Sequence, residues 1–219
     1  MKKFILPLLL LLAIGMLAAV ESDPSAVVGY VKYDCVIGDN AVAMPMVQTF
    51  TTTTEFGAQY PGDEINTISI WNAESQYWES SVNYGGGFWD PELPVGTGVV
   101  LFFNTTADLT YYSIGDLPET NAQYNFVIGD NAVMVPLDRS DLTTTALAGA
   151  TMGDGETVNT ISLWNPAGQY WESSVNYGGG FWDPELNTSI GTPMFLNSGT
   201  EEVWPAAPAK TKQSINTKK

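Results

Sequence analysis

Residues 76–93, QYWESSVNYGGGFWDPEL, recur without a change as residues 169–186. The match extends upstream in a looser form, because NTISIWN at 66–72 returns as NTISLWN at 159–165. An identity of this length between two parts of one chain indicates that the chain contains two copies of one structural unit.

A third block gives the length of the repeating unit. VIGDNAV at 36–42 recurs at 127–133, an offset of 91 residues, whereas the later blocks recur at an offset of 93. The change of offset places an insertion, and therefore a surface loop, between the blocks. We expect two modules, 26–114 and 115–205, each long enough to bury a core of its own.

The residues that lead into the identical segment alternate in the manner of a β-strand. Within 65–72, Ile68 and Ile70 fall on one face, and Trp71 falls on the other face with Thr and Ser. The following NAES has turn chemistry, and residues 76–81 return as a second strand. The pattern predicts a β-hairpin at the centre of each module.

The rest of each module also favours strands. Residues 99–103 and 109–113 are rich in β-branched and aromatic side chains and predict two more strands. One short helix is expected over 142–148, with Asp141 as its cap. The predicted fold class is all-β, with two tandem β-sandwich or small β-barrel modules.

The two ends of the chain differ in character from the modules. Basic Lys2 and Lys3 precede an apolar run, and residues 1–20 together are typical of a signal peptide, although an uncleaved anchor is the alternative. We therefore expect a secreted protein, extracellular or at the cell surface, with no membrane span after cleavage. Residues 206–219 predict a disordered basic tail.

Charge and residue counts exclude several functions. Residues 21–209 hold all 24 acidic residues but only two basic ones, Lys32 and Arg139. Such an acidic surface repels phosphate backbones, so nucleic acid is not an expected partner. The chain has no histidine, which removes the commonest general base and zinc ligand. Its single cysteine, Cys35, forms no intramolecular disulfide and is expected to be a buried thiol.

We expect no cofactor and no metal site. The acidic residues that offer oxygen ligands for Ca²⁺ lack the spacing of a calcium loop. Gly38-Asp39-Asn40, and its copy at 129–131, are interpreted as tight turns, with Ca²⁺ as the weaker alternative.

The blocks IGDNAV, QYWESS and YGGGFWDPEL resemble Trp- and Gly-punctuated β-repeats of secreted and surface proteins of environmental bacteria. The resemblance covers residues 36–104 and 127–197. It implies an extracellular, non-catalytic module, and it supplies no characterised ligand site.

The repeated segment is the candidate binding surface. Flat aromatic faces beside Asn and Asp suit sugars, whose apolar faces stack on rings while their hydroxyls find polar partners. Trp78, Phe88 and Phe102 are expected to pack in the core, whereas Trp71 is either exposed or covered by a second layer. The candidate ligand-binding residues are Trp71, Tyr77, Asn83, Tyr84, Trp89, Asp90, Trp164, Tyr170, Asn176, Tyr177, Trp182 and Asp183.

Three functions fit this sequence. The first is a non-catalytic extracellular or cell-surface repeat protein with a structural, assembly or adhesive role, whose partners are other copies of itself. The second is a carbohydrate-binding protein that uses exposed aromatic residues in each module on an extracellular polysaccharide. The third is a glycoside hydrolase that uses carboxylates such as Glu79, Asp90 and Glu92. We expect a non-enzymatic protein.

Overall fold

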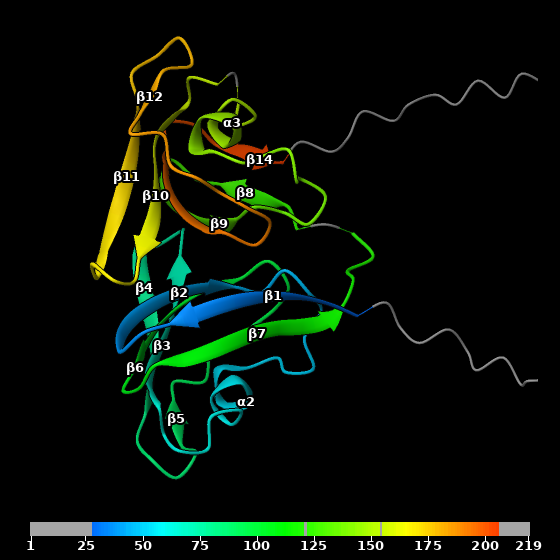
Figure 1. The fold of residues 1–219 in the computed structure, drawn as a ribbon, viewed down its shortest axis with the longest axis vertical. Helices are drawn as coiled ribbons and strands as arrows, with labels where there is room; N and C mark the ends of the chain where they lie inside the picture. The colour runs from blue at the N-terminus through cyan, green and yellow to red at the C-terminus, as the bar shows by residue number, and fades with distance from the viewer. Residues whose placement is uncertain (1–27, 121, 154, 206–219) are drawn as a thin grey trace, which may run out of the picture.

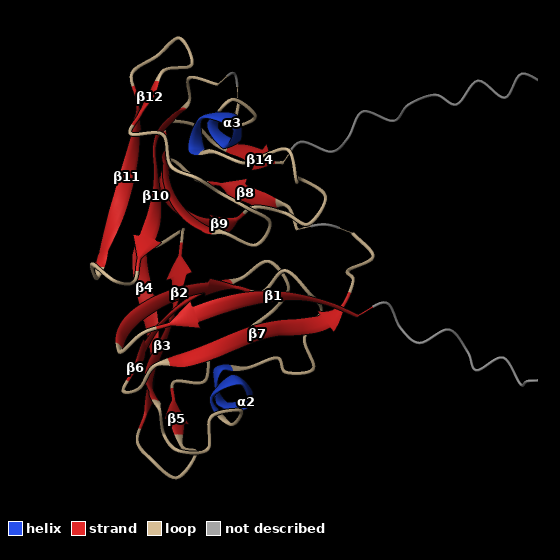
Figure 2. Cartoon of the chain, in the orientation of Figure 1, coloured by secondary structure: helices blue, strands red, loops and turns tan. Residues whose placement is uncertain are grey.

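The computed structural model describes residues 28–120, 122–153 and 155–205, so the proposed signal peptide and basic tail lie outside the described residues. The chain is all-β, as predicted, and forms two modules stacked along the long axis of the molecule (Figures 1 and 2). Within the described residues, no helix combines the length and the apolar character that crossing a bilayer requires.

Module 1 is a small two-layered β-sandwich. One layer is an antiparallel sheet in the order β2-β6-β3-β4-β5. Its strands are β2 (Gly38–Ala43), β3 (Ile65–Asn72), β4 (Tyr77–Asn83), β5 (Trp89–Asp90) and β6 (Val100–Thr105). The other layer is an antiparallel ribbon of β1 (Val28–Cys35) and β7 (Leu109–Asp116), accompanied by the short helix α2 (Thr53–Gly57).

Module 2 repeats this architecture. Its sheet has the order β12-β11-β10-β13-β9. Its strands are β9 (Gly129–Met134), β10 (Val158–Asn165), β11 (Tyr170–Asn176), β12 (Trp182–Asp183) and β13 (Pro193–Ser198). The second layer consists of the shorter ribbon of β8 (Tyr124–Phe126) and β14 (Glu202–Trp204), with helix α3 (Thr145–Gly149).

The predicted central hairpin is confirmed. Strands β3 and β4 pair antiparallel from Thr67 opposite Val82 to Asn72 opposite Tyr77, and the intervening residues form the turn. Ile68 is fully buried on the inner face of the sheet, and Trp71 lies on the opposite face. The two further strands predicted at 99–103 and 109–113 are also present, as β6 and β7.

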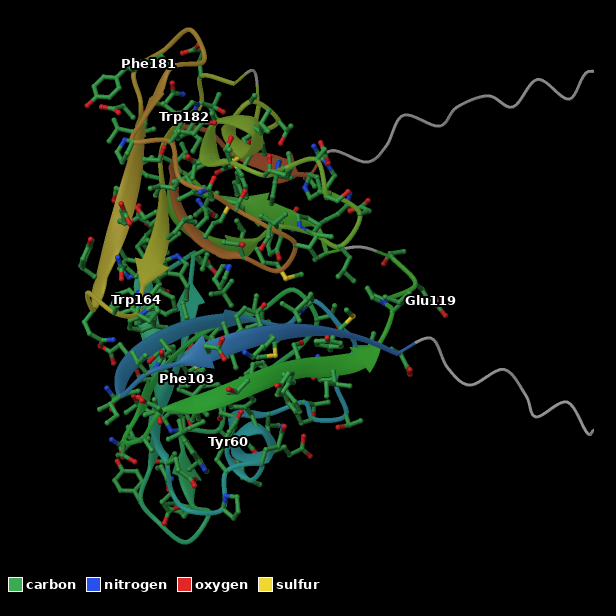
Figure 3. All side chains as sticks on the ribbon, in the orientation of Figure 1. Tyr60, Phe103, Glu119, Trp164, Phe181 and Trp182 are labelled. Atoms are coloured by element: carbon green, nitrogen blue, oxygen red, sulfur yellow. The ribbon has the colours of Figure 1, made fainter. Side chains whose placement is uncertain are left out.

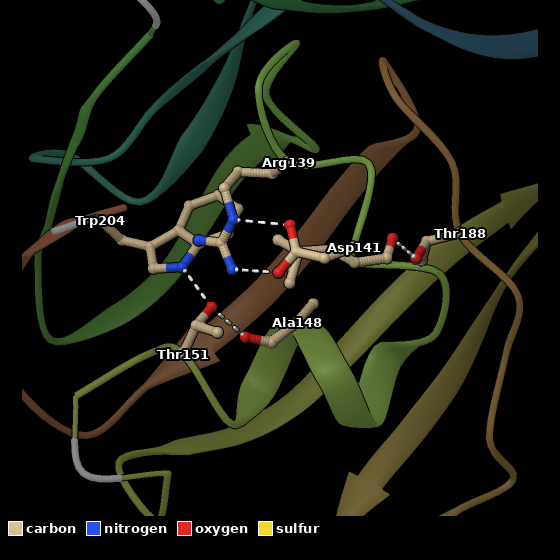
Figure 4. Close-up of polar contacts among 7 residues, drawn as sticks. Arg139, Asp141, Ala148, Thr151, Thr188 and Trp204 are labelled. Atoms are coloured by element: carbon tan, nitrogen blue, oxygen red, sulfur yellow. Dashed lines mark hydrogen bonds and ion pairs between the residues drawn. The ribbon is translucent and has the colours of Figure 1, made fainter. Parts of the chain in front are cut away.

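The helix expected after Asp141 begins later than predicted. Helix α3 starts at Thr145, and the Thr144 hydroxyl caps it by accepting a hydrogen bond from the Leu147 N–H at 3.3 Å. Asp141 instead forms a bidentate ion pair with Arg139, at 2.9 and 2.8 Å (Figure 4). Module 1 contains the equivalent helix, α2, which we did not expect from the sequence.

Each module has its own core, between the five-stranded sheet and the layer of ribbon and helix. In module 1, Phe56 of α2 lies at the centre of this core, against Phe103 and Tyr111. In module 2, Trp204 is buried and its indole N–H donates to the Thr151 hydroxyl at 2.9 Å (Figure 4). The core of module 1 therefore does not include Trp71 and Trp78, the rings next to the turn of the central hairpin.

Strand β7 continues past residue 114, where we placed the boundary between the modules. Gly115 pairs with Gly29 inside the ribbon, and a Cβ at Gly115 would strike the carbonyl oxygen of Val47. This glycine therefore serves a close approach of two backbones rather than a break between domains. The connection between the modules is the segment 117–123.

Candidate binding tips and the aromatic seam

The repeated tryptophans Trp71 and Trp164 join the two modules. The Trp71 indole N–H donates to the backbone carbonyl of Asp130 at 2.9 Å, and the Trp164 N–H donates to that of Asp39 at 2.8 Å. The two bonds are the same contact made in both directions, so an approximate two-fold axis relates the modules.

Six rings from both modules pack around this axis, and we call them the aromatic seam. Trp71 meets Phe195 edge to face with centroids 4.8 Å apart, and Phe102 meets Trp164 in the same geometry at 4.8 Å. Edge-to-face pairs of this kind contribute about 0.5–1.5 kcal/mol each beyond their burial. The seam consists of Trp71, Trp78, Phe102, Trp164, Trp171 and Phe195.

The seam corrects the interpretation of Trp71 and Trp164 as open sugar platforms. Both indoles are half-buried, and each faces the other module rather than solvent. The alternative that we left open, a second packed layer over this face, is what the structure has, and the layer is the other module. Trp78 and Phe102 also pack, but in the seam and not in the core of their own module.

A pair of glutamines extends the reciprocal contact. Gln76 accepts from the Asp130 N–H at 2.7 Å and donates to the Asp130 carbonyl at 2.9 Å, and Gln169 does the same to Asp39 at 2.7 and 3.0 Å. A Cβ at Gly129, where φ is +110°, would lie 2.5 Å from the Gln76 side-chain oxygen. Gly38-Asp39-Asn40 and its copy are therefore not the tight turns we expected: they begin strands β2 and β9, and these strand starts are part of the contact between modules.

Two tyrosines, Tyr33 and Tyr124, make a further pair of equivalent hydrogen bonds between the modules. The Tyr33 hydroxyl donates to the carbonyl of Gly191 at 2.8 Å, and the Tyr124 hydroxyl donates to that of Gly98 at 2.9 Å. Burial raises the pKa of both phenols well above its ordinary value. Both hydroxyls therefore remain donors over the whole neutral range.

Exposed aromatic pairs occupy the two ends of the molecule. In module 1, Tyr84 and Phe88 are 66% and 61% exposed, with ring centroids 5.9 Å apart. In module 2, Tyr177 and Phe181 are 66% and 62% exposed, with the same 5.9 Å separation. The β4–β5 loop and the β11–β12 loop that carry these pairs lie at opposite ends of the molecule, and Phe181 is labelled at one of them (Figures 1 and 3). We call residues 84–88 and 177–181 the tips.

Three glycines hold each tip in its shape. Gly85, Gly86 and Gly87 have φ of +87°, +63° and +80°, a conformation that residues with a side chain rarely adopt. A Cβ at any of them would meet nothing within 4 Å, so the glycines serve the backbone conformation and not close packing. The loop closes with a bond from the Tyr84 N–H to the Phe88 carbonyl at 2.9 Å.

Asn83 anchors the tip to the sheet. Its side-chain oxygen accepts from the Gly85 N–H at 2.8 Å, and its amide donates to the Ile65 carbonyl at 3.0 Å. Asn176 makes the same two bonds in module 2, to Gly178 and Val158. These asparagines therefore position the tip, and their polar groups are engaged inside the protein.

Trp89 and Trp182 are not available to a ligand. Each is only 5% exposed and packs against a helix glycine, Gly57 or Gly149. A Cβ at Gly57 would lie 2.5 Å from the Trp89 ring. Assigning these two tryptophans to ligand binding was therefore wrong, because β5 and β12 turn these side chains towards the core.

The remaining candidate ligand-binding residues lie at opposite ends of β4 and β11. Tyr84 and Asp90, with their copies Tyr177 and Asp183, are exposed at or next to the tips. Tyr77 and Tyr170, which are 48% and 51% exposed, lie at the other ends of β4 and β11, roughly 20 Å away for a seven-residue strand. The twelve candidates thus do not form one surface in either module.

Phe88 and Phe181 are the tip residues that sequence reasoning missed. We expected Phe88 in the core, but its ring is 61% exposed, at the end of the loop of three glycines with positive φ. The available signal was the run of three glycines directly before it, because such a backbone seldom belongs to a packed strand.

Two of the carboxylates that we considered for hydrolysis, Glu79 and Asp90, lie on opposite faces of the sheet. Asp90 pairs with Val82, and Glu79 is three residues from Val82 along β4, so the Glu79 and Asp90 side chains project from opposite faces of the sheet. Within the part of the chain that the structure describes, no group of three or more Cys, Asp and Glu side chains is arranged to hold a metal ion.

A cavity of about 1170 Å³ lies between the modules, beside the segment that connects them. Its lining includes Trp71, Tyr124, Glu119 and Arg139. Asp141 accepts from the Nε and one terminal nitrogen of the Arg139 guanidinium, and Arg139 in turn lowers the pKa of the Asp141 carboxyl, so this cation is already paired with its neighbour (Figure 4). Among the lining residues that the structure describes, Arg139 is the cation, and it is paired.

Comparison with protein-family models, with curated proteins and with solved structures finds no match to this chain. The interpretation of the tips therefore rests on their geometry and on the internal repeat.

Proposed function

We propose that this protein is a non-catalytic extracellular protein that bridges neutral polysaccharide chains through its two aromatic tips. The observation that carries the proposal is the unchanged copy of Tyr84 and Phe88 as Tyr177 and Phe181, at positions where neither pair serves a core or the seam. An exposed ring contributes little to folding, so a stability requirement does not account for these residues.

The chemistry of the tips favours a neutral glycan. Two neighbouring rings offer flat apolar faces on which the apolar faces of sugars stack. The acidic body of the protein repels anionic polymers at low salt. The exposed Asp90 beside the tip offers an acceptor for sugar hydroxyls.

The placement of the tips favours bridging over tighter binding to one strand. They lie at opposite ends of the long axis (Figure 1), so one short oligosaccharide does not reach both. Two identical ends suit a cross-link between polymer chains or between a polymer and a surface. The adhesive role and the glycan-binding role that we derived from the sequence then become one function.

The test separates binding from bridging. The double substitution Tyr84→Ala/Phe88→Ala removes one tip, Tyr177→Ala/Phe181→Ala removes the other, and a quadruple variant removes both. Loss of a stacking contact is expected to weaken binding by about 1–3 kcal/mol, on the scale of base–aromatic stacks. The measurements are pull-down on insoluble neutral polysaccharides (cellulose, chitin and xylan) and the turbidity of suspended polysaccharide particles.

The single-tip variants should still bind but should lose the ability to agglutinate particles, and the quadruple variant should lose both. The matched control is Tyr30→Ala/Tyr112→Ala, which removes an exposed aromatic pair on the β1–β7 ribbon with centroids 6.0 Å apart. This control should bind and agglutinate as the unchanged protein does. Equal binding by the quadruple variant and the unchanged protein would refute the proposal, and loss of self-association instead would assign the tips to assembly.

A further inference from the structure

The interface between the modules, which contains the seam, joins two surfaces that are near copies of each other. Among the described residues, the hydrogen bonds between the modules occur in equivalent pairs, made by Trp71 and Trp164, by Gln76 and Gln169, and by Tyr33 and Tyr124. Such isologous surfaces are the kind through which identical subunits form dimers. Here a single chain supplies both halves.

Some pairs of equivalent positions in this interface differ in size, and one of these pairs is fully buried. Ala43 and Met134 occupy the same place at the ends of β2 and β9, offset by 91 residues like the rest of this block. They are 0% and 1% exposed and form one buried cluster with Val100 of β6. Tyr33 and Tyr124 pack against the same cluster. The long Met134 side chain thus shares a buried space with the small Ala43.

Like modules do not reproduce this fit. Two copies of module 1 would place alanine at both positions and leave the space of the Met134 side chain empty, which removes its packing. Two copies of module 2 would place methionine at both positions and overfill the space. The unlike pair therefore has a packing advantage, although the hydrogen-bonding groups of the two modules are equivalent.

We propose that the seam recognises the unlike module specifically, and that a second copy of this chain binds there by exchanging modules. Module 1 of one chain then pairs with module 2 of the other, and the two remaining modules pair with each other. Both interfaces of the exchanged dimer are identical to the one within a single chain, so exchange loses no contact.

Covalent linkage determines when exchange occurs. The connecting segment 117–123 spans at most roughly 25 Å when extended. Short linkers hold their modules at effective concentrations in the millimolar range, so the pairing within one chain prevails in dilute solution. Exchange prevails where chains are concentrated. It also prevails where substitutions remove the size match between positions 43 and 134 within each chain, and a second chain supplies the matching residue.

Two full-length variants turn this into a test. The Ala43→Met chain has methionine at both positions, and the Met134→Ala chain has alanine at both, so neither contains a matched pair. When the two are mixed, exchange brings one methionine and one alanine together at each interface, and these matched pairs form only between chains. The variants carry different affinity tags and are refolded together from urea, and heterodimers are then measured by tandem tag capture and light scattering.

We expect the mixed variants to give on the order of tenfold more heterodimer than two tagged copies of the unchanged chain, which corresponds to about 1.4 kcal/mol of preference. The double variant Ala43→Met/Met134→Ala, which restores a matched pair within one chain, should be monomeric and should recover the urea midpoint. Heterodimer no more abundant than in the unchanged mixture would overturn the proposal. Failure of the double variant to recover the midpoint would overturn the size match.

Discussion

Replacing Trp71 with alanine tests the aromatic seam directly. The substitution removes an indole that contacts Trp78 at 5.4 Å and Phe195 at 4.8 Å between ring centroids. It also removes the donor of the 2.9 Å bond to the Asp130 carbonyl. An exposed sugar platform would contact neither Phe195 nor the Asp130 carbonyl, because both belong to the other module.

The expected loss follows from these contacts. Removing a fully buried large aromatic ring costs about 3–5 kcal/mol, and the half-buried Trp71 should lose about half of that. The hydrogen bond adds about 1 kcal/mol. Trp71→Ala should therefore lower the free energy of unfolding by about 3 kcal/mol. Trp71→Phe retains a ring and should cost at most about 1 kcal/mol, because Gln76 still donates to the Asp130 carbonyl.

The assay is urea unfolding followed by circular dichroism, with the free energy taken from the midpoint and slope. Trp164→Ala should give the same loss as Trp71→Ala, because it makes the equivalent contacts. The double variant should lose less than the sum, since the first substitution already opens the shared seam. The control is Phe88→Ala at the tip, which should change stability by no more than about 0.5 kcal/mol. A Trp71→Ala protein as stable as Phe88→Ala would refute the seam as a source of stability.

Two further predictions concern the cores. Helix propensity alone favours Gly57→Ala by up to about 1 kcal/mol, but the new Cβ would lie 2.5 Å from the Trp89 ring. We therefore expect Gly57→Ala to lower the free energy of unfolding in urea by about 1–3 kcal/mol. The neutral control is Gly96→Ala, because Gly96 has open space around it. Burial raises the pKa of four tyrosines, so above pH about 10 the unfolded state binds fewer protons than the folded state. The free energy of unfolding should then fall with rising pH, by up to about 1.4 kcal/mol per pH unit for each tyrosine. Urea midpoints that stay constant to pH about 12 would contradict this. These tyrosines are Tyr33, Tyr60, Tyr111 and Tyr124.

The central hairpin could be predicted because its signals are local. Alternation around Ile68 and Ile70, and a turn between two strands, act within about ten residues of chain. The partner of Trp71 could not be predicted in this way, since Asp130 lies 59 residues away. A period of two reports which side chains share a face, but it does not report whether that face meets water or another module.

Helix α2 escaped prediction for a different reason. Its segment and that of α3 differ in most residues, so the repeat was not visible there. Yet the Thr53 hydroxyl donates to Ser81 at 3.0 Å, and Thr145 donates to Ser174 at 2.8 Å, so the same buried bond ties each helix to its sheet. A few buried positions preserve the shape while the exposed ones vary.

The candidate site was predictable as a segment but not as a surface. The identical copy drew attention to residues 76–93, and this segment runs from the contact between modules at Gln76 to the tip at Phe88. Hydrophobicity alone places Phe88 inside and gives Trp71 no partner. The glycine conformations and the second module reverse both assignments.

The two-fold relation between the modules makes the two ends of the molecule equivalent, and this affects any assembly that the molecule forms. Turning it end over end exchanges one tip for an equivalent one, so a contact made by either end has no direction. The longer β1–β7 ribbon, which breaks this equivalence, lies at the side of the molecule and not at its ends (Figure 1). A network joined through the tips would therefore be non-polar, with orientation set only by what attaches at the sides.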